Sequence, residues 1–173
     1  MSFEEVVQKA IRGDDQSFLA AIQTVKIDLY KTALAYLRKE EDALEAIQEV
    51  TFRAYKGLKG LKEPCYFKTW IIRIMINYCN DTLKKQRRII LNDDLLDAEG
   101  EAEDHSLLEI EEAMQRLDER SREIITLKYF HDLKIKDIAK TLDCPEGTVK
   151  TWLFKALKSL RENLDEKGGV SHV

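Results

Sequence analysis

The sequence predicts an all-α protein: two small helical domains joined by an acidic flexible linker, the second ending in a helix-turn-helix. Apolar residues recur every three or four positions along most of the chain, and β-branched residues never alternate over a strand-length run. Seven Gly and two Pro among 173 residues favour long helices and short loops. A run of acidic residues divides the chain beyond its middle, which indicates two folding units rather than one.

The composition narrows the class of protein. Hydrophobic residues make up 44% of the chain and charged residues 35%, which is typical of a soluble globular protein. Residues 1–15 are polar and acidic, so we expect no secretory leader and a cytoplasmic location. Three cysteines without CxxC spacing predict reduced thiols and no structural metal site.

The charge is sorted along the chain, although the net charge is only −4. Residues 53–88 carry ten basic and two acidic side chains, whereas residues 89–112 carry ten acidic side chains and no basic one. The net charge argues against a nucleic-acid partner. The local field decides which partner binds, however, and the basic segment suits an anionic one.

The chain is expected to divide into a first domain at 1–90, an acidic linker at 91–107, a second domain at 108–166 and a disordered tail at 167–173. In the first domain we expect four helices: one near residues 3–12, one from about 15 into the thirties, one near 41–58 and one near 66–88. Two Gly and one Pro mark a loop near residues 57–64. The candidate core residues of these helices are Phe18, Ile22, Leu29, Ala33, Tyr36, Leu44, Ile47, Val50, Ala54, Trp70, Ile71, Ile74, Met75 and Tyr78.

The second domain is expected to begin with a helix near residues 107–117. Asp118 and Ser121 are candidate N-caps for the next helix, which has an apolar run of Ile124, Ile125, Leu127 and Tyr129.

Residues 132–164 predict a helix-turn-helix. The first helix has an apolar stripe, and the sequence Asp143-Cys144-Pro145 then interrupts it, since Pro is accepted only in the first turn of a helix. The second helix has one apolar face, formed by Val149, Leu153, Ala156, Leu157 and Leu160, and a second face that is basic. The basic face suits the major groove of DNA, although solvated lysines on an ordinary bundle helix would give the same pattern.

The residues Gly147, Thr148, Val149, Lys150, Thr151, Ala156 and Leu160 closely resemble the promoter-reading helix of bacterial extracytoplasmic-function (ECF) RNA polymerase sigma factors, of the sigma-70 family. The resemblance implies that this helix reads the −35 element. The residues expected to contact DNA are Thr148, Lys150, Thr151, Phe154, Lys155 and Lys158, with Arg161 nearer to the phosphates.

A second motif, in the first domain, is similar to the same family. Asp42, Ala43, Glu45, Gln48, Glu49 and Phe52 match the family's D-A-x-[DE]-x-x-Q-[ED]-x-F pattern. The resemblance implies that this helix docks on the clamp of core RNA polymerase, with Ile47 as a further contact. From the residues alone, an acidic edge could pair with a basic partner or could simply be a solvated face.

A third motif follows in the family's order: Phe67, Thr69, Trp70, Ile71, Ile74 and Asn77 match F-x-T-W-[LI]-x-x-I-x-x-N. Basic residues interleaved with aromatic ones suit single-stranded DNA, although the aromatic rings could also be core. The resemblance implies that the loop and this helix capture an unpaired base of the −10 element and help to melt it. The residues expected there are Gly60, Leu61, Lys62, Tyr66, Phe67, Lys68, Trp70, Arg73 and Asn77.

The sequence contains no phosphate loop, catalytic triad or zinc-ligand spacing, so we expect no enzyme, no cofactor, no metal and no small-molecule substrate. The partners that the resemblance implies are core RNA polymerase, through its β′ clamp and β flap, promoter DNA and an anti-sigma factor. An anti-sigma factor anchored in the membrane would hold the protein at the inner membrane face.

Two other functions remain open from the residues alone. A helix-turn-helix repressor or activator would need a dimer interface and a palindromic operator. A helical adaptor that binds no DNA would make both basic faces incidental. Binding to core polymerase separates a sigma factor from a repressor, and DNA affinity that falls steeply with salt separates both from an adaptor.

Overall fold

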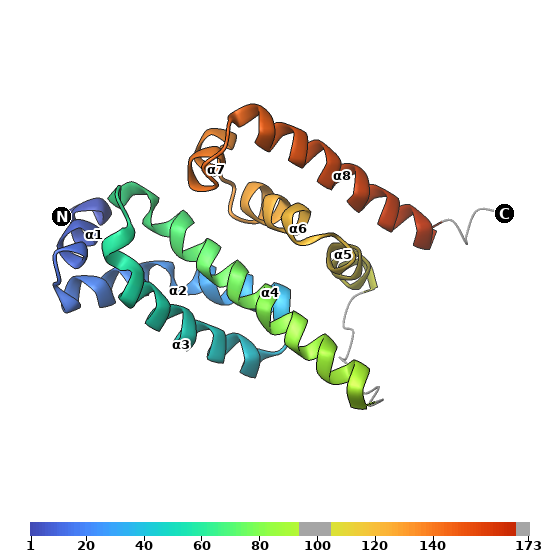
Figure 1. The fold of residues 1–173 in the computed structure, drawn as a ribbon, viewed down its shortest axis with the longest axis horizontal. Helices are drawn as coiled ribbons and strands as arrows, with labels where there is room; N and C mark the ends of the chain where they lie inside the picture. Colours follow the sequence, from blue (N-terminus) through green and yellow to red (C-terminus); the bar gives the residue numbers. More distant parts are fainter. Residues whose placement is uncertain (94–104, 169–173) are drawn as a thin grey trace. The chain divides into compact units, whose positions relative to one another are not determined.

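The computed structural model describes residues 1–93 and 105–168. Every regular element within these ranges is helical, and they contain no strand, so the predicted all-α fold is confirmed. The chain divides into two compact units, Met1–Asp94 and Leu95–Val173. Figure 1 shows α1 to α4 in the first unit and α5 to α8 in the second.

The first unit consists of four helices with two short 3₁₀ turns between the last two. The elements are α1 (Phe3–Ile11), α2 (Asp15–Leu37), α3 (Glu40–Gly57), η1 (Leu58–Gly60), η2 (Pro64–Tyr66) and α4 (Phe67–Asp93). Helix α2 packs against α1, α3 and α4, and α3 also packs against α4. The long helix α2 is therefore the centre of the bundle.

Local chemistry explains where these helices begin and end. The Ser2 hydroxyl accepts from the backbone N–H of Glu5 at 3.2 Å, and the Glu5 carboxylate accepts from the Ser2 N–H at 3.1 Å. This reciprocal cap starts α1. Gly13, at φ +106°, turns the chain into α2, and Arg38 ends α2 in the left-handed region at φ +65°. Three acidic residues in the first turn of α3 complement the positive end of its helix dipole.

Most of the predicted core residues of the first unit are buried. The side chains without solvent exposure include Val7, Leu29, Val50, Phe67, Ile71, Ile72, Met75, Ile76 and Cys79. The prediction was wrong for Leu44, whose side chain is 48% exposed. Leu44 lies about 100° around the helix from Ala43 and its buried stripe, because each α-helical residue rotates by that angle. Trp70, Ile74 and Tyr78 are half-buried.

Cys79 is expected to resist thiol reagents while the protein is folded. Burial raises its pKa to about 12 from an ordinary value of 9.0, and only the thiolate reacts. A maleimide pulse at pH 8, read by peptide mass spectrometry, should label Cys65 and Cys144 before Cys79; in urea all three should react. Equal labelling of Cys65 and Cys79 in the native protein would contradict this. The same shift stabilises the fold below pH 9, and that contribution is lost as pH rises toward 12.

The second unit packs three shorter helices against a long one. Its elements are α5 (His105–Gln115), α6 (Glu119–Ile125), the π-helical turn η3 (Thr126–Phe130), α7 (Ile135–Thr141) and α8 (Glu146–Gly168). Helix α8 contacts α5, α6 and α7. Leu117, Ile125 and Ala156 form a buried cluster, with Met114 and Leu160 packed against it.

The predicted cap and turn of the second unit are present. Asp118 is the N-cap of α6, and its carboxylate accepts from the N–H of Ser121 at 2.7 Å. Asp143 takes the left-handed conformation at φ +52°, and the N–H of Cys144 donates to the carbonyl of Ala139 at 3.0 Å. This turn redirects the chain so that α8 can pack against α7.

Three details differ from the sequence-based expectation. Helix α4 extends to Asp93 and α5 begins at His105, so both enter the segment expected as the linker, 91–107. Helix α8 continues to Gly168, inside the expected tail. Residues 94–104 and 169–173, which include most of the expected acidic linker, lie outside the described residues. Tyr129, expected in the apolar run of α6, is 56% exposed on the π-helical turn.

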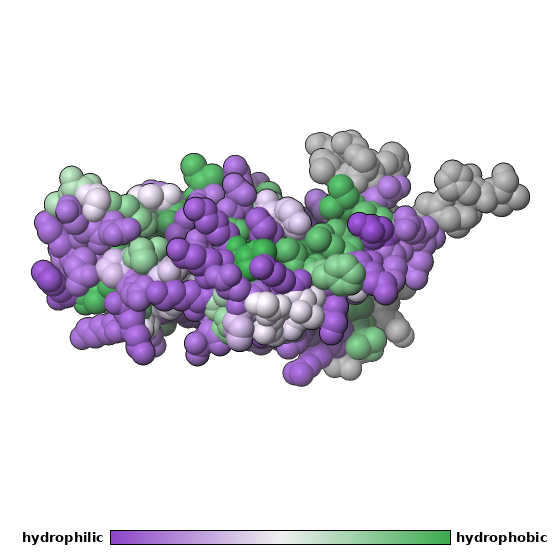
Figure 2. All heavy atoms as spheres, turned by 90° about the horizontal axis from the view of Figure 1, so that it is seen from above, coloured by the Kyte–Doolittle hydropathy of each residue, from purple (hydrophilic) through white to green (hydrophobic). Residues whose placement is uncertain are grey.

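Hydrophilic side chains cover most of the face seen in Figure 2, and the hydrophobic ones form separate groups among them. In residues 1–93 and 105–168, no helix combines the length and the apolar character needed to cross a membrane.

Candidate functional site

The outer face of α3 carries apolar side chains among acidic ones. Leu44, Gln48 and Phe52 follow one another at intervals of four residues, and Tyr55 continues the line. The side chains of Leu44, Phe52 and Tyr55 are 48%, 53% and 52% exposed. Glu45 is also exposed, whereas Asp42 and Glu49 are half-buried. We call Leu44, Glu45, Gln48, Glu49, Phe52 and Tyr55 the α3 outer face.

Two residues that the sequence placed on this interface are buried. Ala43 has no solvent exposure and Ile47 is 9% exposed, because both lie on the stripe of α3 that also carries Val50 and Ala54. Their side chains face the core of the bundle, and their part in binding stays a prediction. Leu44 and Tyr55, which the motif does not include, are exposed on the outer side of the same helix.

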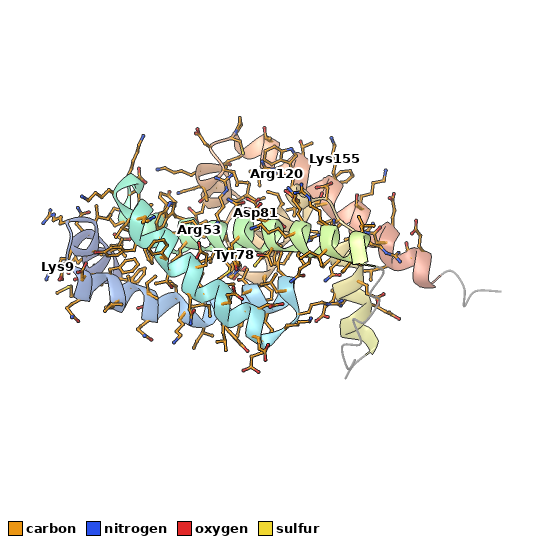
Figure 3. All side chains as sticks on the ribbon, turned by 60° about the horizontal axis from the view of Figure 1, so that its bottom comes forward. Lys9, Arg53, Tyr78, Asp81, Arg120 and Lys155 are labelled. Atoms are coloured by element: carbon orange, nitrogen blue, oxygen red, sulfur yellow. The ribbon has the colours of Figure 1, made fainter. Side chains whose placement is uncertain are left out.

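Contacts at the C-terminal end of α3 hold this face in place. The hydroxyl of Tyr55 donates to the Asp15 carboxylate at 2.9 Å, which raises the pKa of Tyr55. The guanidinium of Arg53 lies 5.2 Å from the centre of the Tyr78 ring and 3.1 Å from the carboxylate of Glu49. Figure 3 shows Arg53 and Tyr78 close together on α3 and α4. The end of α3 is therefore tied to both α2 and α4.

The loop before α4 and the adjoining part of that helix form a second candidate surface. Gly60, Lys62 and Asn77 are exposed. Tyr66, Lys68, Trp70 and Arg73 are half-buried. Arg73 and Asn77 are four residues apart and lie on the same side of α4. The ammonium group of Lys68 pairs with the Asp28 carboxylate of α2 at 3.0 Å, which fixes the first turn of α4.

Leu61 and Phe67 differ from the other residues predicted for this surface, because their side chains are buried. Leu61 is 8% exposed and Phe67 has no solvent exposure. Phe67 packs instead between the rings of Phe3 and Trp70, with both centroid distances at 5.9 Å. The buried side chains of these two residues support the loop from the side of the core.

The third candidate surface is the outer face of α8. The exposed residues on it are Lys150, Thr151, Phe154, Lys155 and Lys158, and Thr148 is half-buried. Phe154 is 72% exposed, although it is aromatic. The hydroxyl of Thr151 donates to the Gly147 carbonyl at 3.0 Å. Figure 3 shows Lys155 extending outward from α8.

The opposite side of α8 is anchored by its predicted apolar face and by one contact, between Arg120 and Trp152, that the sequence did not predict. Val149 and Ala156 are fully buried. The guanidinium of Arg120 on α6 lies 4.6 Å from the centre of the Trp152 ring on α8, and its Nη1 lies 4.0 Å from a carboxylate oxygen of Glu123. A cation over an aromatic ring adds a favourable contact between the two helices. This contact and the buried apolar face hold α8 against α6, with its basic face outward.

These surfaces suit the binding of macromolecules. The part of the chain that the structure describes contains no group of three His, Cys, Asp or Glu side chains placed to hold a metal ion. The charged and aromatic side chains lie on convex helix faces, where nucleic acid or another protein can reach them.

Comparison with known proteins assigns the family. The family model "Sigma-70 region 2" matches residues 21–89, and "Sigma-70, region 4" matches residues 107–160. The RNA polymerase sigma factor SigV of Bacillus subtilis is 31% identical over 145 residues, which cover 82% of this chain and 87% of SigV. The chain belongs to the sigma-70 family of RNA polymerase sigma factors.

Two further relatives refine this assignment. The ECF RNA polymerase sigma-E factor of Haemophilus influenzae is 26% identical over 182 residues, covering 95% of this chain and 94% of that one. The predicted ECF membership is confirmed. The sigma factor RpoE of Bartonella quintana, solved in complex with the anti-sigma factor NepR, has a similar fold, with a TM-score of 0.64 at 20% identity over 87% of this chain and 98% of RpoE.

Family membership settles the general function. This sigma factor directs promoter-specific initiation of transcription by RNA polymerase. The repressor and adaptor alternatives are excluded, because the matches cover both units in the family's order. Sigma factors are not known as enzymes.

Proposed function

We propose that this sigma factor binds core polymerase, the −10 element and the −35 element through three different surfaces. The α3 outer face binds the β′ clamp of core polymerase. The loop at 58–66, with the exposed side of α4, captures an unpaired base of the −10 element. The outer face of α8 reads the −35 element in the major groove.

The observation that carries this proposal is the outer face of α8. Lys150, Lys155 and Lys158 surround Phe154, which leaves 72% of its side chain in water. Lysines around an accessible ring make a cationic face that suits an anionic partner. The major groove offers acceptor atoms and phosphates to the lysines and apolar methyl groups to the ring.

The −10 assignment rests on the exposed part of the second surface. Lys62 and Asn77 supply a cation and an amide, and the half-buried Tyr66 and Trp70 supply rings near them in the sequence. A base that leaves the duplex needs a stacking partner and hydrogen bonds, since unstacking is costly. Leu61 and Phe67 act indirectly, by supporting the loop.

The α3 outer face is the best-suited surface for a protein partner. It combines three exposed apolar or aromatic side chains with exposed or half-buried acids, which fits a basic, amphipathic helix of the polymerase clamp. Ala43 and Ile47 set the helix position from the core side. In the same proposal, the second unit contacts the β flap of the polymerase.

We further infer that an anti-sigma factor regulates this protein in the cytoplasm by covering these surfaces. The RpoE structure contains an anti-sigma factor, and the exposed apolar side chains of α3 and α8 give such a partner docking points. A membrane-anchored anti-sigma factor would hold the protein at the inner membrane face.

Replacing Lys155 with alanine tests the role of α8. We expect transcription from −35-dependent promoters to fall about 10- to 100-fold, the range of one lost base contact, while affinity for core polymerase is unchanged. The assay pairs in vitro transcription with a core-binding titration. Lys31→Ala, an exposed lysine on α2, is the matched control and should behave as wild type. Equal loss of transcription and core binding by Lys155→Ala would refute the assignment.

A further inference from the structure

Helix α1 packs directly against the loop that precedes α4. It contacts both short turns of that loop, η1 and η2, as well as α2. The ring of Phe3 meets the ring of Phe67 edge-on, at 5.9 Å and an interplanar angle of 68°. Phe67 is the residue at which the loop ends and α4 begins.

The aromatic contact continues from Phe67 to the other end of the loop. The ring of Trp70 lies 5.9 Å from that of Phe67. A Cβ atom placed on Gly57, the last residue of α3, would lie 3.6 Å from Cζ2 of Trp70. The rings of Phe3, Phe67 and Trp70 therefore form an aromatic cluster that spans the two ends of the loop.

The ends of the loop are fixed while its exposed residues face outward. Leu58 and Leu61 are 4% and 8% exposed and anchor the first turn. Lys59, Gly60, Lys62 and Cys65 are exposed. Within the loop, the backbone N–H of Leu61 donates to Leu58 at 3.0 Å and that of Tyr66 donates to Glu63 at 3.1 Å. Packing of the loop against the helices beneath it acts together with these local hydrogen bonds.

Helix α1 is short, yet its sequence fixes it firmly. A nine-residue helix is marginal in isolation, but the reciprocal cap of Ser2 and Glu5 starts it, and Val7 and Ala10 are buried against the bundle. The helix lies outside residues 21–89, the part that the region 2 family model matches. A capped helix that buries one face against the bundle and places its first aromatic residue against Phe67 has the features of a support for the loop.

We propose that α1 braces the loop at 58–66, and that Phe3 is a positioning residue for base capture at the −10 element. This inference rests on the proposed −10 role of the loop. Phe3 acts through Phe67 and touches no DNA. Holding the loop in its binding conformation in advance removes the ordering cost that a loose loop would incur when the base enters. A loop held in one shape also cannot adjust to bases that fit it poorly, so the brace increases the selectivity of capture as well as its strength.

The test uses holoenzyme assembled from the full chain and core polymerase. A promoter is first selected with the wild-type holoenzyme. Single-stranded oligonucleotides of its non-template −10 strand are then made with each of the four bases at every position in turn, and their affinities are measured by fluorescence anisotropy. We expect Phe3→Ala to reduce the preference for the favoured base about two- to tenfold, the range expected for one lost aromatic pair. Phe3→Tyr, which keeps the ring, should retain the wild-type preference.

Two controls make the result decisive. Glu4→Gln changes an exposed neighbour on α1 and should match wild type. Core affinity reports whether the first unit is folded; if Phe3→Ala fails that check, Phe3→Leu, which keeps most of the volume without the ring, replaces it.

Wild-type selectivity in the ring-deleted variant would overturn the brace, and so would equal weakening toward all four bases. If the wild-type holoenzyme itself prefers no base at any position, the proposed −10 role of the loop fails instead.

Discussion

Replacing Arg122 with alanine is expected to destabilise the second unit by on the order of 3–5 kcal/mol. Arg122 is only 6% exposed. Its Nε donates to the carbonyl of Met114 at 3.1 Å, and its Nη2 donates to the carbonyls of Gln115 at 2.9 Å and Leu117 at 3.1 Å. One buried cation thus donates to three carbonyls at and just beyond the C-terminal end of α5. The last carbonyls of a helix have no N–H donor within the helix. A positive charge at this end is also favoured by the helix dipole.

The effect is large because small domains have little stability to lose. A typical domain is stable by about 5–15 kcal/mol, and each buried carbonyl left without a donor costs about 1–3 kcal/mol. Urea unfolding followed by circular dichroism should show an early transition for the second unit, and −35-dependent transcription should be lost at growth temperature. Affinity for core polymerase through the α3 outer face should survive in part.

Arg116→Ala is the matched control. Arg116 also lies just beyond α5, but it is half exposed and pairs with Glu166 at 3.8 Å, where both side chains reach water. Exposed pairs contribute less than about 1 kcal/mol. If both variants unfold at the same urea concentration, Arg122 does not hold the unit together.

Replacing Phe52 with alanine is expected to weaken binding to core polymerase about 30-fold or more, the loss that a central aromatic contact gives at an interface. Phe52 lies at the middle of the exposed line on α3, 53% exposed, and the ammonium group of Lys56 sits 4.4 Å from its ring centre. Because the side chain reaches solvent, folding stability should change by no more than about 0.5 kcal/mol. A titration of labelled sigma factor with core polymerase measures the loss.

Leu19→Ala provides an equal change elsewhere on the same unit. Leu19 on α2 is also 53% exposed, so its removal deletes a similar apolar surface outside the proposed interface. Core affinity should then stay within about twofold, as for other surface substitutions. Equal weakening by the two substitutions would mean that general surface hydrophobicity, rather than the α3 outer face, governs the affinity.

The helix-turn-helix shows how much local sequence can predict. The break at Asp143-Cys144-Pro145 and the apolar spacing beyond it were sufficient to place the turn and the outward face of α8. Asp143 adopts the left-handed conformation that its side chain tolerates. These features depend on neighbours in the sequence, so the sequence alone reveals them.

The outcome for α3 marks the limit of motif matching. Ala43 and Ile47 match or adjoin a pattern whose other members are accessible, yet they are buried, while Leu44 is exposed. A motif mixes residues that bind with residues that place the helix. Only packing against α2 and α4 separates the two groups, and that packing is not encoded in the spacing of one helix.

Long-range contacts could not be predicted at all. The edge-on contact between the rings of Phe3 and Phe67 joins residues 64 positions apart. The contact between Arg120 and Trp152 joins α6 to α8. From the sequence alone, Arg122 would be expected to be an exposed charged residue like most arginines. Its role depends on the end of α5 lying beside it, which follows from the tertiary fold.

In vitro transcription with sigma-free core polymerase, on a library of genomic promoters, tests whether this sigma factor selects promoters through the proposed surfaces. We expect discrete start sites whose upstream sequences share one −35 and one −10 motif, with Lys155→Ala losing the −35 preference and Phe52→Ala losing transcription as a whole. Transcripts that start without a shared motif, or none at all together with no comigration with core polymerase on a sizing column, would contradict this expectation.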